Sequence, residues 1–514
     1  MRVTNSMISN SARSHISNAK TMLNKYEQQY TTEKKIQRPS DDPTVAVRSL
    51  KLRTTYAQLT QYAEKNIQDA MDWMDTTESA MSNISSLLTN MKSYLNQGAN
   101  DPLKPDDRKS VLSTLRQYVN SIFADEANTD YSGRYVFTGY RTDTSLLFQE
   151  DTNTLSYQIK EKLKYTDISN VTVVKGGANY DPAANGQDYV DDAATTDSVY
   201  RMNLAYNNLS NEEFPEESDK SIGSPIKIQI SYTEKEALTP GEKPETITET
   251  LEPVEIKHST DPEAYNIEED GIVYLYDTGE ILMGKSVYAD IQQKQADITV
   301  DYCKNSFEKN EIRPEMYFEC LRYDSVENKV LEYIEPSKQN INYEVNYSQT
   351  ITVNTQARDA ISTDIYRTVD YIEQTIEAVT DVENRISEVE KMISNTQDKD
   401  EIAALNSLKK VLTDEKELRM SVMTEAFGKG LTMVDNAQQM VSVAVSELGA
   451  KYNRAQLTYD KLLDEQTDTE EKLSGNEDVN FEDVFINLTQ ANNLYQASLS
   501  ATSKILGNTL LNYI

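Results

Sequence analysis

The last part of the chain has a helical pattern of apolar positions. In residues 481–514 the apolar and small side chains recur every three or four residues, as in one face of a coiled-coil helix. The positions on this face are Phe485, Leu488, Asn492, Tyr495, Leu499, Thr502 and Leu506. From residue 485 onward the sequence has no acidic residue and a single basic one, Lys504. We therefore predict an amphipathic helix whose apolar face requires a partner.

A second stripe of the same kind lies at the other end of the sequence, where residues 1–37 are predicted to form a helix after a short lead. Its stripe is narrow and consists of Ile8, Ala12, Ile16, Ala19, Leu23, Tyr26 and Tyr30. Small residues on a narrow stripe favour close packing against one or two other helices. Alone, such a helix is marginal in water, because its stripe has nothing to pack against.

We predict that the two terminal helices pair, either within one chain or between neighbouring copies. The candidate contact residues are Ile8, Ile16 and Leu23 on the first helix, and Phe485, Leu488, Tyr495, Leu499, Leu506, Leu510 and Tyr513 on the second.

A short joint follows the first helix, formed by Arg38, Pro39, Ser40, Asp41, Asp42 and Pro43. Pro39 cannot continue a helix and biases Arg38 away from helical geometry. Asp42 followed by Pro43 predicts a helix start, with a carboxylate N-cap and proline at the first helical position. We expect a stiff, capped joint between two packing units.

Long helical patterns fill both flanks of the sequence. Residues 44–97 carry two neighbouring apolar stripes, one of which includes Trp73, and residues 106–128 carry another. Two adjacent stripes indicate a helix buried in a bundle. Residues 359–448 predict a helical hairpin that turns at 395–400. Residues 446–471 continue the helix up to a polar break at 474–478.

The middle of the chain, from about residue 131 to residue 355, has β character. Alternating and β-branched runs between Pro and Gly clusters predict strands. The candidate strands are residues 226–232, 246–256, 272–276, 298–302, 342–345 and 350–353.

These patterns predict the α+β fold class, as an elongated rod of long helices with terminal coiled-coil helices and an inserted, mainly-β domain. We expect a terminal assembly domain (1–40 and 474–514), a helical bundle domain (41–145 and 355–473) and a solvent-facing β domain (146–354).

Charge separates the ends from the middle. The 514 residues have a formal net charge of −33, yet residues 1–62 carry +6 and residues 485–514 carry +1, which leaves −40 for the remainder. An acidic body disfavours nucleic acid and anionic membranes as partners. No segment has the pattern of a signal peptide or a membrane span. Cys303 and Cys320 either form one bridge or remain free thiols.

Catalytic motifs are missing from the sequence. His15 and His258 are the only histidines, which argues against histidine-based triads and histidine-rich metal sites. The run Lys175-Gly176-Gly177 lacks the context of a phosphate loop. Asp191-Asp192 lacks EF-hand spacing for calcium. We expect no enzyme activity, no metal and no cofactor.

Several stretches carry a resemblance to a known family. They are MRVTNSMISNS at the start, KKIQRPSDDPTVAVRSLKLRT at the joint, DWMDTTESAMSNI, GRYVFTGYRTDT, and YQASLSATSKILGNTLLNYI at the end. Together they resemble bacterial flagellin-type axial proteins and, more narrowly, the hook-associated protein 3 family of the hook–filament junction. The resemblance covers about residues 1–140 and 440–514. Pro39 and Pro43 around the paired aspartates distinguish this joint from the flagellin pattern.

The resemblance implies a structural protein of the extracellular flagellum, secreted without a cleaved signal through the flagellar type III apparatus. The partners that it implies are copies of the chain in a ring, hook-associated protein 1, flagellin, and an export chaperone at the C-terminal segment. Flagellin, another hook-associated protein, and a surface adhesin that binds through its β domain are the alternatives.

Overall fold

The computed structural model describes residues 5–100, 104–179, 190–215, 221–233, 246–261, 263–334 and 339–511. The chain forms two compact units. Unit 1 consists of Met1–Met71, Asn342–Ile351 and Tyr452–Ile514, and unit 2 consists of Asp72–Ile341 and Thr352–Lys451. Long helices and antiparallel sheets both occur, so the predicted α+β fold class is confirmed. The predicted domain boundaries near residues 40, 145, 354 and 473 stay predictions.

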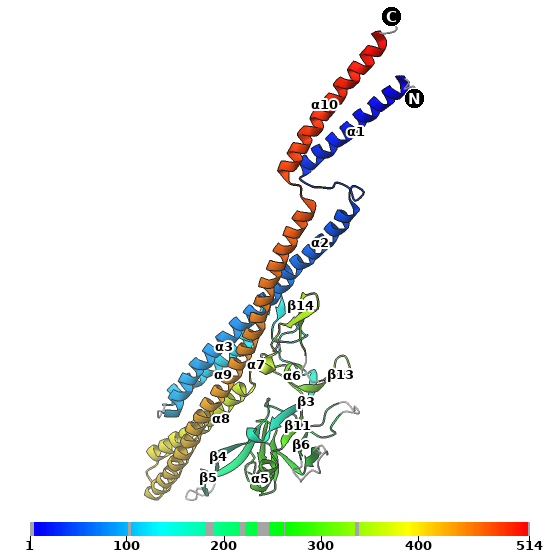
Figure 1. Ribbon diagram of the computed structural model, residues 1–514. Coiled ribbons are helices and arrows are strands. Elements are labelled where there is room, and N and C mark those ends of the chain that lie inside the picture. Colours follow the sequence, from blue (N-terminus) through cyan, green and yellow to red (C-terminus); the bar gives the residue numbers. More distant parts are fainter. Residues whose placement is uncertain are drawn as a thin grey trace. The chain divides into compact units, whose positions relative to one another are not determined.

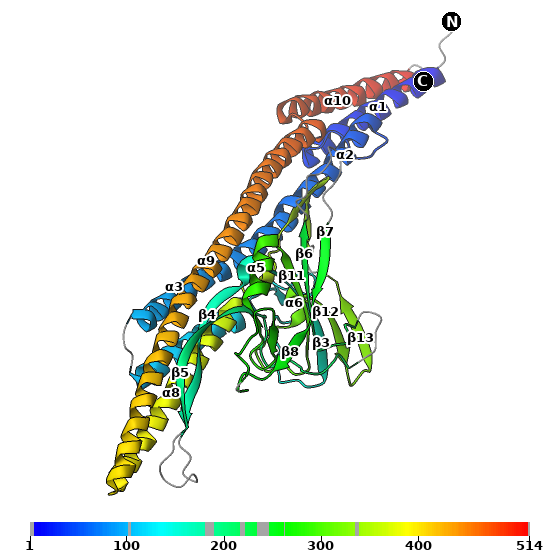
Figure 2. The same cartoon turned by 90° about the horizontal axis from the view of Figure 1, so that it is seen from below.

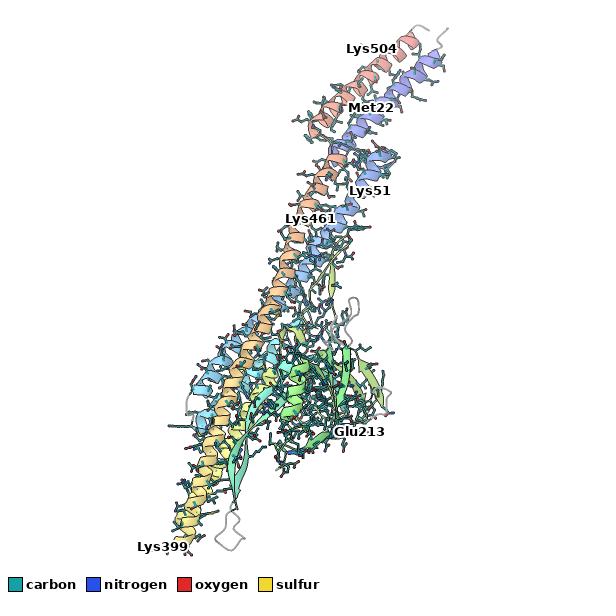
Figure 3. All side chains as sticks on the ribbon, turned by 60° about the horizontal axis from the view of Figure 1, so that its bottom comes forward. Met22, Lys51, Glu213, Lys399, Lys461 and Lys504 are labelled. Atoms are coloured by element: carbon teal, nitrogen blue, oxygen red, sulfur yellow. The ribbon has the colours of Figure 1, made fainter. Side chains whose placement is uncertain are left out.

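Unit 1 is built from helices that come from both ends of the chain. Helix α1 (Asn5–Thr32) lies antiparallel to α10 (Phe481–Leu511), so that the start of α1 lies beside the end of α10 (Figures 1 and 2). Met22 on α1 and Lys504 on α10 mark this pair in Figure 3. Helix α2 (Pro43–Gln61) continues through a π-helical turn, η1 (Tyr62–Ile67).

A small hairpin docks on this π-helical turn. The hairpin consists of β14 (Asn342–Asn346) and β15 (Gln349–Thr352), and Asn66 Nδ2 donates to the backbone oxygen of Glu344 at 2.8 Å. Helix α9 (Lys399–Glu477) passes through both units, as does α3 (Gln68–Asn100). The long helix predicted to continue through residues 446–471 is therefore confirmed.

The helical part of unit 2 contains the buried stripes that the sequence predicted. It consists of α3 with α4 (Pro105–Asn120), the π-helical turn η2 (Ser121–Glu126), α8 (Asp364–Asn395) and α9. Trp73 is fully buried, with the Tyr131 ring 5.9 Å away, which confirms its predicted place in the core. Both stripes of α3 are buried, at Met74, Ala80, Met81, Ile84, Leu88, Met91 and Leu95.

Two larger sheets form the β part of unit 2, and they are antiparallel except for the β8–β9 pair. The five-stranded sheet has the order β4-β5-β10-β9-β8, and the six-stranded sheet β13-β12-β3-β11-β6-β7. The bounds of the first are Ser169–Asn179, Val190–Asn203, Glu280–Met283, Ile272–Leu275 and Val254–Lys257. Those of the second are Lys329–Tyr333, Glu319–Asp324, Leu155–Lys164, Asp297–Lys304, Ile226–Thr233 and Thr246–Leu251.

Short elements complete unit 2. They are the hairpin of β1 (Asp130–Tyr131) and β2 (Arg134–Tyr135), the 3₁₀ turn η3 (Tyr165–Asp167), and the helices α5 (Lys285–Lys294), α6 (Pro314–Tyr317) and α7 (Ala357–Ala360).

The predicted β region is correct in kind but incomplete in detail. Strands β3, β4, β5, β10, β12 and β13 and helix α5 were not predicted. The run predicted as a single strand, residues 246–256, forms two strands in different sheets, β7 and β8. Pro253 lies at this break and lacks the N–H that a continuous strand would use for pairing.

The two cysteines are free and buried. Cys303 on β11 lies opposite Gln158 of β3, whereas Cys320 on β12 lies opposite Ile159. Adjacent residues of a strand point to opposite faces of the sheet, so the two thiols lie on different faces and do not form the bridge left open above. No helix among the described residues combines the length and the apolar character needed to cross a membrane.

Candidate assembly interface and joint

The α1–α10 pair has a narrow core with small residues at its centre. Ala12 and Ala19 are buried on α1, and Val484 and Ala491 are buried on α10. Alanines at these positions allow the two helix backbones to approach closely. At one end of the pair, the Tyr30 ring lies 5.0 Å from that of Phe481. The pairing predicted for the terminal helices therefore forms within a single chain.

The predicted contact residues differ in exposure. Ile16, Leu23, Leu488 and Tyr495 are half-buried, and they lie three or four residues from the buried alanines, on the same helix faces. Ile8, Phe485 and Leu499 are exposed. Leu506 and Leu510 belong to α10, but their side chains lie outside the described part, as does the whole of Tyr513.

Val484 and Ala491 were missed as contact residues. The register of residues 484, 488, 491, 495, 498 and 502 is a heptad pattern that would have found them. The stripe predicted from the sequence contained some positions of this register, such as Leu488 and Tyr495, together with exposed apolar residues, such as Phe485 and Leu499.

Large apolar side chains remain exposed along the terminal pair. They comprise Met7, Ile8, Met22, Phe481, Phe485, Ile486, Leu494 and Leu499, whose exposed fractions lie between 36% and 59%. Single exposed apolar residues are ordinary, but eight large ones on two helices leave much apolar area in contact with solvent. The surface therefore has the character of an interaction site.

The joint is held by its two aspartates. The Asp41 carboxylate accepts hydrogen bonds from the backbone N–H groups of Gln37 and Arg38, at 3.1 and 2.9 Å, which lower the pKa of Asp41. Asp42 accepts from the backbone N–H groups of Thr44 and Val45, so the predicted N-cap with Pro43 in the first turn is confirmed.

The first helix ends five residues before the predicted position. It ends at Thr32 because Glu33 adopts a left-handed conformation (φ 58°) and the chain then pairs with the connection before α10. The Lys35 N–H donates to the Glu477 backbone oxygen at 2.7 Å, and the Val479 N–H donates to that of Glu33 at 3.0 Å. The predicted break at 474–478 likewise starts later, since α9 continues to Glu477.

Ion pairs fasten these two connections to each other. Arg53 donates two hydrogen bonds to the carboxylate of Glu477, at 2.7 and 2.6 Å, and Lys34 pairs with Asp478. The bonds from Arg53 lower the pKa of Glu477, and the bond from Lys34 lowers that of Asp478. We call the contacts of Lys34, Arg53, Glu477 and Asp478 the joint clasp.

A polar cavity of about 670 Å³ lies in unit 2, between α4, α8 and the loops after β5 and β11. Two of its ion pairs are Arg116 with Asp370, at 2.6 Å, and Lys304 with Glu311, at 3.0 Å. The described residues contain no group of three or more His, Cys, Asp or Glu side chains that could hold a metal ion.

Both ends of the chain match known sequence families. Residues 3–142 match the bacterial flagellin N-terminal helical region, and residues 431–514 match the bacterial flagellin C-terminal helical region.

Two curated relatives carry the name flagellar hook-associated protein 3. The protein of Escherichia coli K12 is 30% identical over 135 residues, which covers 26% of this chain and 42% of the relative. The protein of Salmonella typhimurium LT2 is 29% identical over 145 residues, which covers 28% of this chain and 45% of the relative. The match thus spans less than half the length of each relative.

Solved structures show weaker likenesses. A protein described as a flagellar hook-associated protein of Vibrio parahaemolyticus has 12% identity and a TM-score of 0.36, over 85% of this chain and 100% of that chain. Flagellar hook associated protein-3 of Legionella pneumophila has 13% identity and a TM-score of 0.30, over 82% and 98%.

Proposed function

We propose that the chain is a flagellin-type structural axial protein of the bacterial flagellum that joins hook-side proteins to the flagellin filament. Both flagellin helical regions are present, one at each end, and the matched relatives are named hook-associated protein 3. The extracellular hook–filament junction is the proposed location.

The exposed apolar surface of the α1–α10 pair carries this proposal. The pair buries its alanine-centred core within one chain and leaves the side chains of Ile8, Phe485 and Leu499 in contact with solvent. Complete burial of a Leu, Ile or Phe side chain contributes roughly 1.5–3 kcal/mol. Neighbouring copies that cover this surface would therefore gain stability that a single chain lacks.

The proposed assembly has several partners. Copies of the chain form a ring through the terminal pair, with hook-associated protein 1 on one side and flagellin on the other. A flagellar export chaperone holds the C-terminal segment before secretion. Residues 38–43 act as the joint between the terminal assembly domain and the helical bundle domain.

No catalytic role is proposed, because the matched relatives are named as parts of the flagellum. A flagellin, another hook-associated protein and an adhesin are the competing assignments.

Deletion of the gene tests the proposal. Cells without a junction protein should export flagellin that cannot attach, so unpolymerised flagellin should accumulate in the medium while hooks remain on the cells. Expression of the full chain should restore filaments and swimming. Deleted cells that keep normal filaments would overturn the proposal. Cells that lose flagellin itself from the medium would instead identify the chain as the filament protein.

A further inference from the structure

A shallow groove of about 460 Å³ lies beside the joint in unit 1. Its lining includes the cations Lys35, Arg48 and Lys472 and the apolar side chains of Val45 and Leu52, and none of the described residues that line it is acidic. We call it the joint groove. Three cations around an apolar floor stand out in a chain with a net charge of −33.

The two walls of the joint groove are fixed by hydrogen bonds. Asn476 Nδ2 on α9 donates to the Val45 backbone oxygen at 3.1 Å and to Ser49 Oγ at 2.7 Å, which ties α9 to α2. Lys35 Nζ donates to the Gly475 backbone oxygen at 2.7 Å. The groove therefore exists before any partner binds.

Its cations retain capacity for a further anion. Lys472 lies 3.3 Å from Asp468, but both side chains are more than 60% exposed, so water and salt screen this pair. The chemistry of the groove fits a segment that combines a carboxylate with exposed apolar side chains.

The first turns of α10 present such a segment. Glu482, Phe485 and Ile486 stand at positions i, i+3 and i+4, so they share one face of the helix. All three side chains are exposed in the single chain, Phe485 and Ile486 by more than half. We call this the acidic-apolar face.

We propose that the joint groove of one copy binds the acidic-apolar face of a second copy of this chain. The carboxylate of Glu482 lies among the three cations, and Phe485 and Ile486 cover Val45 and Leu52. Complementary charge and exposed apolar side chains on both surfaces select this occupant. The inference rests on the proposed function and adds which surfaces of neighbouring copies meet.

Disulfide trapping between two co-expressed chains tests the contact. One chain carries Arg48→Cys and the other Glu482→Cys, and intact flagella are oxidised after isolation. The expected product is a dimer with twice the mass of the chain, which neither single variant forms alone. The native thiols of Cys303 and Cys320 are buried and stay out of the reaction.

The matched control replaces Arg48→Cys by Lys51→Cys, one turn further along the exposed side of α2. If the pair with Arg48→Cys yields no more disulfide-linked dimer than the pair with Lys51→Cys, the proposed contact is wrong. If those cells still swim and keep their filaments, the proposed function stands and only the contact is wrong.

Charge exchange supplies a second readout. Arg48→Glu alone and Glu482→Arg alone should each weaken the contact by about fivefold, which corresponds to the upper range of an exposed ion pair. The double variant should recover part of the junction protein retained on isolated flagella, because Lys35 and Lys472 still face the new arginine. A double variant no better than the weaker single variant would contradict the pairing. Failure of the gene-deletion test would overturn the function itself.

Discussion

Arg53 and Glu477, 424 residues apart in the sequence, form a bidentate ion pair in which the Glu477 side chain is only 5% exposed. The pair joins the second helix of the chain to the last turn of α9. Next to it, the Lys35 N–H donates to the backbone oxygen of Glu477. The joint clasp thus fixes both connections that lead into the terminal pair.

Loss of the Arg53 side chain should loosen the joint clasp. Arg53→Gln leaves a buried carboxylate without its two charged donors, which costs about 1–2 kcal/mol after allowance for the exposed arginine side. Hydrogen exchange at the amides of Lys35 and Val479 should become about five to thirty times faster.

A matched variant on the same helix distinguishes loss of the ion pair from a general effect of replacing a cation by glutamine on α2. Lys51→Gln removes a cation from the exposed side of α2 and should leave the exchange of both amides unchanged. The double variant Arg53→Gln with Glu477→Gln should recover part of the protection, because the buried charge is then removed. Equal exchange in Arg53→Gln and in the native chain would show that the clasp does not hold the joint.

Acid should open the joint clasp. Ion pairing lowers the folded-state pKa of Glu477 and of Asp478 below their ordinary values of 4.5 and 3.8. A depressed pKa contributes stability that is complete above the unfolded-state pKa and is lost as the pH falls through the folded-state pKa. Exchange at Val479, corrected for its intrinsic pH dependence, should therefore accelerate below about pH 4.5. In Glu477→Gln most of this acceleration should disappear. If the variant showed the same acceleration as the native chain, protonation of Glu477 would not be what opens the joint clasp.

The opposite pH trend is expected in unit 2. Burial raises the pKa of Glu161 to about 7, while its Oε2 accepts hydrogen bonds from Tyr302 Oη at 2.8 Å and from the Ala205 N–H at 3.0 Å. The folded chain therefore holds this proton up to about pH 7, whereas the unfolded chain releases it near its ordinary value of 4.5. The stability that Glu161 contributes should be complete below pH 4.5, fall as the pH rises to 7, and then level off.

Urea unfolding followed by the fluorescence of Trp73 reports on this unit. Between pH 4.5 and 7 the native chain should lose on the order of 3 kcal/mol from this group, and Glu161→Gln should show a correspondingly smaller loss in that window. A native profile that is already flat there would contradict the raised pKa.

The helical parts were predictable because helix signals are local. The double stripe of α3, the N-cap at Asp42 and the turn at 395–400 follow from spacing and capping chemistry within a few residues. The ends of α1 and α9 were displaced because contacts with distant residues decide them, as the pairing of Lys35 with Glu477 shows.

The β region was less predictable for a related reason. Strands β4 and β5 pair over a long register that includes charged and glycine residues, so their pattern is not a simple alternation of apolar and polar residues. Val484 and Ala491 were overlooked because the prediction favoured larger apolar residues as contact residues. Some of those larger residues, such as Phe485, face solvent, whereas the smaller ones form the core of the terminal pair. Tertiary partners, which one sequence does not display, determine both features.

Leu499 offers the most direct test of the apolar surface. Its side chain is 43% exposed beside the core of the terminal pair, so Leu499→Asp should leave the fold and the export of the chain intact. In an assembled junction the added carboxylate would lie in a dry helix interface, which is strongly unfavourable. We expect exported protein in the medium, loss of incorporation into flagella, and loss of swimming. Ser500→Asp adds the same charge at the next, exposed position of α10 and should retain incorporation. Normal junctions and swimming in Leu499→Asp would show that this surface is not covered by neighbouring subunits.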